Sequence, residues 1–260
     1  MIGILGASIY EAILESHLER STVSTRYGDV PVLMGTVGDR EVAYIRRFGW
    51  EGGMASDVVS HASHALALRQ LGVRRAFTLN AFGSVNPSLR VGDLVAYHDY
   101  IRMCERTPTT IFAGEQQWPR AKMEVPFCPE VHEALATAAR NNSQRRVIDR
   151  AVNICVQGPH NETPAEIEAY RRWGADIVCT TIYPEVVYFR ELETCFAGLC
   201  WISDAAGVSD QKDWVRITPE ELTPLIREAI GAIPEQAHCE CQRTWVGSEN
   251  RLPPWYLAMR

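Results

Sequence analysis

The sequence lacks the features that mark several classes of protein. No apolar run approaches the ~20 residues that cross a bilayer, and residues 1–6 have no basic start of the kind a signal peptide has. There is no basic excess either: the net charge is -6, whereas binding a nucleic-acid backbone requires a basic face. No internal repeat or low-complexity segment is evident. We therefore expect a cytoplasmic protein with small-molecule partners and neither a membrane nor a nucleic-acid partner.

The eight cysteines do not form a recognisable disulfide or metal-binding pattern. Most of them, such as Cys179 and Cys200, lie in apolar contexts, which is typical of buried free thiols in a reducing compartment. The only close pair is Cys239 and Cys241. No second Cys or His pair lies at zinc-finger spacing, so we interpret this pair as incidental and predict no metal site.

Composition and patterning indicate one α/β domain. With 46% hydrophobic and 22% charged residues, the chain has the composition of a soluble globular protein. Strand-like and helix-like segments alternate, which predicts a single domain over 1–233 with a central mixed, twisted sheet flanked by helices, followed by a loosely held tail over 234–260. The expected strands cover 2–5, 30–37, 41–46, 74–81, 91–95, 152–156, 175–180 and 195–203. The expected helices cover 9–23, 56–71, 129–141, a segment from Pro164, 184–193 and 219–230.

The stretch 153–166 has the local features of a binding loop. An apolar strand stops at Gly158-Pro159, and the polar loop 160–162 leads into a helix. Thr163 is the expected N-cap and Pro164 the first helical residue. Glu166 completes the spacing of a capping box. A strand followed by a turn and a helix N-terminus is where α/β folds place substrate-binding residues.

Polar residues follow six of the expected strands, although each has a simpler interpretation when taken alone. A lone arginine is usually solvated, and a carboxylate at a helix N-terminus gains ~0.3–1 kcal/mol from the helix dipole. His61 and His64 stand three residues apart, and a helix surface or subunit contact is favoured over a metal site. The strand-end residues are Ser8, Arg47 with Glu51, Asn80-Ala81, 160–162, 180–185 and Asp204.

The order of these motifs resembles the purine nucleoside phosphorylase family of the trimeric type, which includes the methylthioadenosine phosphorylases. The resemblance covers residues 1 to about 230. The motifs that carry it are Ile-Gly-Ile-Leu-Gly-Ala-Ser8, Arg47-Phe48-x-x-Glu51-Gly52, Asn80-Ala81-Phe82-Gly83 with Gly92-Asp93, Pro126-Phe127-Cys128, Gly158-Pro159-x-x-Glu162-Thr163, and Asp176 with Thr181-x-x-Pro184-Glu185.

The resemblance implies an enzyme in which inorganic phosphate, the co-substrate, attacks C1′ of a purine nucleoside and releases the base. It implies no other cofactor, and it implies a homotrimer. Glu162 would recognise the base, and a protonated Asp204 would donate to purine N7. The other implied contacts are Ser8, Arg47, Thr181 and the Ala81 N–H for phosphate, Asn80 and Thr180 for ribose, and Phe82, Gly83 and Asn161 for substrate.

The sequence departs from the family pattern at four places. Phe48 and Gly49 stand where the family has a phosphate-site histidine, and Asn161 replaces an aromatic that stacks on the purine. Thr180 replaces a methionine, and Ala206 a second aspartate. Two alternatives therefore stay open: a hydrolase that uses water, and a non-catalytic nucleoside-binding protein. Residues considered as compensation for the losses are Trp50, Trp118 and Arg120.

Overall fold

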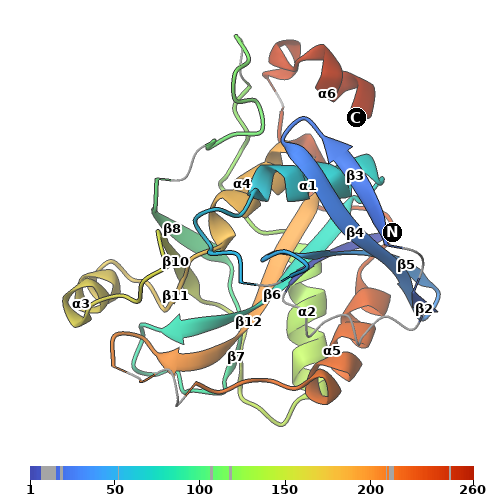
Figure 1. Cartoon of the computed structure of the whole chain (residues 1–260). Helices are drawn as coiled ribbons and strands as arrows, with labels where there is room; N and C mark the ends of the chain where they lie inside the picture. The colour runs from blue at the N-terminus through green and yellow to red at the C-terminus, as the bar shows by residue number, and fades with distance from the viewer. Residues whose placement is uncertain are drawn as a thin grey trace.

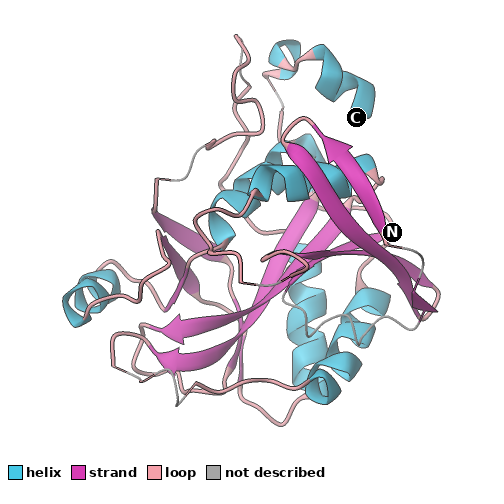
Figure 2. Ribbon diagram, viewed as in Figure 1, coloured by secondary structure: helices cyan, strands magenta, loops and turns pink. Residues whose placement is uncertain are grey.

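The computed structural model describes the chain except residues 7–15, 18–19, 52, 106–107, 117–118, 209, 211–213 and 246. Its strands form one mixed, twisted sheet with helices on both sides, which confirms the predicted fold class (Figures 1 and 2). The strands are β1 Ile2–Gly6, β2 Ser16–His17, β3 Ser21–Thr25, β4 Gly28–Val37, β5 Arg40–Arg46, β6 Arg75–Ser84, β7 Leu94–Ala96, β8 Asp99–Met103, β9 Val147–Ile148, β10 Val152–Val156, β11 Ile177–Cys179 and β12 Cys195–Ala205.

Helices α1 and α4 lie along one side of the long strands β6 and β12, and α2 and α5 lie along the other (Figure 1). Among the described residues, none of these helices is long and apolar enough to cross a membrane. The α-helices are α1 His61–Gln70, α2 Pro129–Asn142, α3 Pro164–Arg172, α4 Ile182–Glu191, α5 Pro219–Ala232 and α6 Pro254–Met259. Two short 3-10 helices, η3 Glu240–Arg243 and η4 Glu249–Arg251, precede α6.

The centre of the sheet is parallel, which brings several strand ends to one edge. β1 pairs in parallel with both β5 and β6, and β6 pairs in parallel with β12. The register between β6 and β12 shifts between Ile202 and Asp204, a bulge that changes how the end of β12 faces its neighbour. Because parallel strands end at the same edge, the residues that follow β1, β5, β6 and β12 lie near one another.

Local sequence signals were most reliable where a turn or a cap is encoded by a few residues. β4 and β5 form the predicted hairpin around Gly38-Asp39, and α2 spans the predicted segment. α3 begins with the predicted capping box, in which Glu166 N–H donates to Thr163 Oγ1 at 3.3 Å and Thr163 N–H donates to Glu166 Oε2 at 2.8 Å. These features depend on residues close in sequence, so they are readable without the fold.

Two predicted helices near the N-terminus were wrong in the parts that the structure describes. Within 9–23, β2 and the first residues of β3 are strands, and β3 pairs with β4 in antiparallel register. Residues 9–15 and 18–19 lie outside the described residues. The helix predicted from Ser56 begins only at His61, with Ser60 as N-cap. The β-branched pair Val58-Val59 directly before it disfavours helix.

The segment after Pro234 is not loosely held, contrary to the prediction. Trp245 and Tyr256 are fully buried, and the Trp245 indole N–H donates to the Tyr256 hydroxyl at 3.0 Å. Phe112 packs against both rings, with centroid distances of 5.5 Å to each. The segment is polar in composition, but a few of its aromatic residues each bury a large apolar area and hold it against the domain.

Candidate functional site

Strand ends from the two halves of the chain surround one cavity. The register of β6 and β12 sets Asn80 opposite Cys200 and Gly83 opposite Asp204. At the end of β5, the Arg47 N–H donates to the Gly6 carbonyl of β1 at 3.0 Å. The cavity at this edge has a volume of about 570 Å³, which is in the range of small-molecule sites.

Most residues that the sequence predicted for the site line this cavity. They are Arg47, Asn80, Ala81, Phe82, Gly83, Asn161, Glu162, Thr180, Thr181 and Asp204. Ser8 lies outside the described residues. His160, from the polar loop 160–162, also lines the cavity, as does Phe48. Glu51 is exposed and is not among the described residues that line the cavity.

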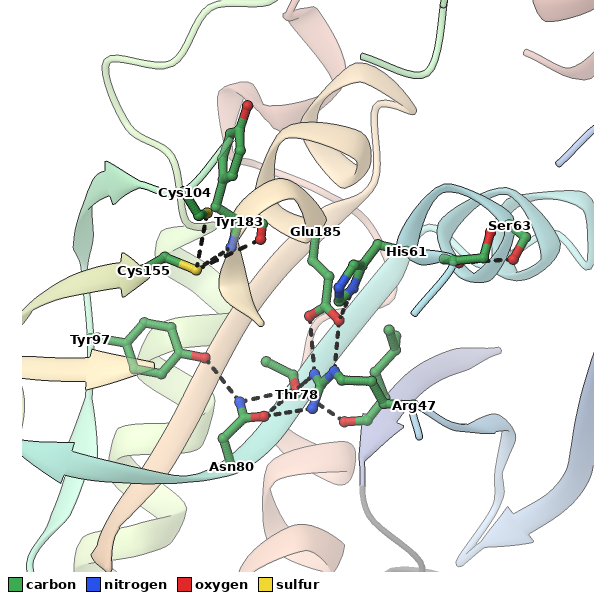
Figure 3. A network of polar contacts seen from close by, with 12 residues as sticks. Arg47, His61, Ser63, Thr78, Asn80, Tyr97, Cys104, Cys155, Tyr183 and Glu185 are labelled. Carbon is green, nitrogen blue, oxygen red and sulfur yellow. Dashed lines mark hydrogen bonds and ion pairs between the residues drawn. The ribbon is translucent and has the colours of Figure 1, made fainter. Parts of the chain in front are cut away.

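Arg47 forms the centre of a buried polar network (Figure 3). Its Nε donates to Glu185 Oε1 at 2.6 Å and its Nη2 donates to Glu185 Oε2 at 3.0 Å, a two-bond ion pair from β5 to α4. Nη1 donates to Asn80 Oδ1 at 2.6 Å, and Nη2 also bonds the Thr78 hydroxyl. We call Arg47, Thr78, Asn80 and Glu185 the arginine region. Its guanidinium is held in a single orientation, because bidentate pairing fixes both position and plane.

Glu185 carries a full negative charge in this network. Burial alone would raise its pKa, but the charge of Arg47 and a hydrogen bond with His61 lower the pKa to about 2. His61 Nδ1 lies 2.9 Å from Glu185 Oε1, and His61 is buried. The prediction of a surface or subunit role for His61 was therefore wrong. His64 Nδ1 is buried and has no hydrogen-bond partner among the described residues, and burial, followed by the charge of His61, lowers the pKa of His64 to about 3.

Asn80 is oriented by the same network. Since its Oδ1 accepts from Arg47, its Nδ2 must be the donor, and it lies 3.1 Å from Thr78 Oγ1 and 3.4 Å from the Tyr97 hydroxyl. Tyr97 is completely buried, and desolvation raises its pKa well above the usual value. The hydroxyl therefore stays protonated. Sequence reasoning missed Thr78, which lies inside a strand pattern typical of the core, and Tyr97, which lies just after a predicted strand and carries no local signal of a site residue.

Glu162 and Asp204, which we call the carboxyl pair, have a different environment. Burial raises the pKa of Glu162, and the nearby charge of Asp204 raises it further. Burial also raises the pKa of Asp204, against a hydrogen bond from the Ser203 hydroxyl to its Oδ1 at 2.6 Å. The capping box of α3 starts at Thr163 and holds the backbone next to Glu162. Both carboxyls line the cavity and are easier to protonate than carboxyls in water.

Two glycines allow close approach around the carboxyl pair. A Cβ at Gly83 would lie 2.9 Å from the Ala206 Cβ and 3.4 Å from Asp204 Oδ2. A Cβ at Gly158, where φ is +30°, would lie 2.7 Å from the Ser56 hydroxyl oxygen. Any larger residue at either position would displace the wall that carries the carboxyls.

Two tryptophans that line the cavity were not foreseen as site residues from the sequence. Trp201 is buried in β12 and also lines the cavity, and Trp214 lines it as well. Trp214 lies in a polar stretch without periodicity, so no sequence signal marked it. Trp50, considered as compensation, instead packs edge-on to Tyr44 and beneath the Arg46 guanidinium. Trp118 lies outside the described residues, and Arg120 is not among the described residues that line the cavity.

Comparisons with known proteins agree with this geometry. A family model described as the phosphorylase superfamily matches residues 1–236. The chain is 35% identical to a 6-oxopurine nucleoside phosphorylase of Pyrococcus furiosus, over 95% of this chain and 98% of the relative. It is 36% identical to a probable S-methyl-5'-thioinosine phosphorylase of Methanopyrus kandleri, over the same shares of the two chains.

The fold is shared with solved structures. The chain superposes on a methylthioadenosine phosphorylase from an Antarctic soil metagenomic library with a TM-score of 0.88, over 99% of this chain and 97% of that one, at 25% identity. A methylthioadenosine phosphorylase from Schistosoma mansoni, in complex with tubercidin, superposes with a TM-score of 0.85 over 96% of this chain and 99% of that one, at 21% identity. At this identity the second likeness shows the fold alone.

Proposed function

Because the chain belongs to the phosphorylase superfamily, we propose that it is a purine-nucleoside phosphorylase, a pentosyltransferase. It cleaves the N-glycosidic bond of a 6-oxopurine nucleoside with inorganic phosphate and releases the free base and the pentose 1-phosphate. The single observation that carries the proposal is one cavity lined by both Arg47 and the carboxyl pair. Asn80 binds Arg47, and Gly83 lies opposite Asp204, so the two regions are three residues apart along β6, about 10 Å.

The carboxyl pair supports recognition of a 6-oxopurine. Such a base carries a hydrogen on N1, which an ionised Glu162 accepts, and an acceptor at N7. Ser203 donates to Oδ1 of Asp204, which leaves Oδ2 beside the bare backbone of Gly83. With the pKa of Asp204 raised by burial, a protonated Oδ2 donates to N7 as negative charge develops on the leaving base. The names of two relatives, a 6-oxopurine nucleoside phosphorylase and a probable S-methyl-5'-thioinosine phosphorylase, support the same choice.

We place the phosphate-binding end of the cavity beside Arg47 and the start of α4. Thr181 directly precedes α4, its side chain makes no capping hydrogen bond, and it lines the cavity together with Arg47. Held phosphate needs little further activation, because it is already a competent nucleophile once positioned.

Hydrolysis is the second candidate, and a specific observation favours it. The charge of Arg47 is already matched by Glu185, and Phe48 stands where the family places a histidine. A weaker phosphate site would leave water as the competing nucleophile.

One assay separates these possibilities. Base release is followed from inosine, guanosine, adenosine and their 5′-methylthio analogues, with and without phosphate. We expect release that requires phosphate, favours 6-oxopurines and yields the pentose 1-phosphate. Release that continues without phosphate and yields free pentose would establish the hydrolase. Thermal stabilisation by nucleosides without release of any base would establish a binding protein.

Three further properties belong to the same proposal. Phosphate is the only co-substrate and no other cofactor takes part in the chemistry. The protein is a homotrimer, as the family resemblance implies, and light scattering on the purified chain tests this. It works in the cytoplasm, which its eight free cysteines support.

A further inference from the structure

Four cysteines from three distant parts of the chain meet at one point. Cys128 precedes α2, Cys195 begins β12, and Cys239 and Cys241 belong to the C-terminal segment. Their Sγ atoms all lie within 4.8 Å of one another. The pair at 239 and 241 is therefore not incidental. The spacing of cysteines along the sequence could not reveal this, because Cys128 and Cys195 are brought next to Cys239 and Cys241 only by the fold.

The sulfur spacing matches a shared metal ion better than disulfide bonds. Cys239 Sγ lies 3.6 Å from Cys128 Sγ and 3.4 Å from Cys195 Sγ. A disulfide requires about 2.05 Å. Four thiolates at about 2.3 Å from a tetrahedral zinc ion stand about 3.8 Å apart. An all-sulfur tetrahedral set is the one that zinc and iron–sulfur centres use, and no carboxylate or histidine of the described residues belongs to this cluster.

The surroundings of the cluster supply positive charge. Arg75 is buried, and its Nη1 donates to Cys195 Sγ at 3.1 Å. The same Nη1 also donates to Glu130 Oε2 at 2.7 Å, and Nη2 is buried without a hydrogen-bond partner among the described residues. A zinc ion with four thiolates carries a net charge of about -2, so a buried guanidinium that donates to one of the four sulfurs stabilises it, in addition to the ion pair of Arg75 with Glu130.

We propose that Cys128, Cys195, Cys239 and Cys241 bind one structural zinc ion. Each thiol loses its proton as its sulfur binds, and no oxidant or reductant is involved. The site is closed, with four protein ligands and no open position for a substrate. Asp204 lies nine residues further along β12, roughly 30 Å away, so the ion has no part in the chemistry of the cavity. It fixes the C-terminal segment to the start of α2 and to the sheet.

The test measures metal and thiol state on the full-length protein. Purified without chelator, the protein should contain ~1 zinc per chain by elemental mass spectrometry, and its denatured mass should show every cysteine reduced. Removing zinc with a strong chelator should lower the melting temperature by roughly 5 to 10 °C. A metal-free, fully reduced protein would overturn the proposal. A denatured mass that is lower by two hydrogens for each disulfide would also overturn the proposal, and so would iron bound in place of zinc.

Three variants make the result specific. Cys239→Ser should lose the zinc and the chelator effect together, and Cys239 is only half-buried, so this change is the least disruptive to the core. Cys239→His, which restores a zinc ligand, should retain the metal. Cys200→Ala removes another buried cysteine of β12 that lies outside the cluster and should keep ~1 zinc per chain. Loss of zinc from Cys200→Ala, or full zinc in Cys239→Ser, would contradict the assignment.

Discussion

The arginine region and the carboxyl pair both contribute residues to the same cavity, but their charges are balanced differently. Arg47 and Glu185 neutralise each other inside the protein, and the pKa of Glu185 falls to about 2. Glu162 and Asp204 have no cationic partner among the described ion pairs, and burial raises the pKa of each. Charges matched within the protein contribute to folding, whereas carboxyls left for a ligand contribute to binding and specificity. Substitutions in the two regions should therefore have different consequences.

The largest expected effect is on stability, from breaking the buried ion pair. Glu185→Ala leaves Arg47 buried without its partner, which should lower the free energy of unfolding by about 3–5 kcal/mol. Chemical denaturation measures this. The control is Arg172→Ala, which breaks the exposed pair with Glu168 and should cost at most about 1 kcal/mol. Equal losses in the two variants would mean that the buried pair has no special role.

The same pair predicts acid sensitivity. The folded pKa of Glu185, about 2, lies below its ordinary value of 4.5. Its contribution to stability is therefore fully present above about pH 4.5 and is lost as the pH falls towards 2, roughly 3 kcal/mol in all. Unfolding measured across this range should show the loss in the wild type. Glu185→Gln should show a flatter profile, and an unchanged slope would contradict the assignment.

At the carboxyl pair the largest effect should be on turnover. Asp204→Ala removes the donor to N7 and should lower kcat for base release by about 10²- to 10⁴-fold. Asp204→Asn keeps a donor that does not titrate, so it should retain far more activity. Because protonated Asp204 is the active form, wild-type activity should fall as the pH rises through its raised pKa. The Asn variant should lack that falling limb.

Glu162→Gln should change specificity more than stability. It removes a charged acceptor for N1–H, worth about 1.5–3 kcal/mol, so kcat/KM for inosine should fall roughly 10- to 150-fold. Adenosine should be affected much less, because Gln can donate to the unprotonated N1 of a 6-aminopurine. Parallel kinetics on the two nucleosides give the ratio. An equal fall for both would show that Glu162 does not read the base.

The smallest effect tests how the loop that carries Glu162 is held. Thr163→Ala should cost about 1 kcal/mol of stability by removing the N-cap of α3, with a modest rise in KM. Thr218→Ala removes the same capping box from α5, where Thr218 does not line the cavity. It should cost about as much stability and leave KM unchanged. If KM rose equally in Thr163→Ala and Thr218→Ala, the cap of α3 would have no specific role in holding the loop that carries Glu162.

Much of the cavity lining was predictable, because its residues lie at or near the ends of strands. Arg47, Asn80, Glu162 and Asp204 were identified from their positions at strand ends, and the parallel core of the sheet brings those ends together. Their roles in catalysis stay predictions. The ion pair of Arg47 with Glu185 could not be read in this way. It joins the residue after β5 to the first turn of α4, and nothing local distinguishes Glu185 from an ordinary helix-start carboxylate.

The sequence by itself determined the α/β class, the capped start of α3, the hairpin at Gly38-Asp39 and the polar strand ends. All of these depend on short-range periodicity and backbone preferences. Only the tertiary structure decided which charges cancel, which carboxyls are left for a ligand, and that the C-terminal cysteines meet Cys128 and Cys195. The reason is physical: pKa values, ion pairs and sulfur clusters depend on distances between residues far apart in the chain, and those distances exist only once the chain has folded.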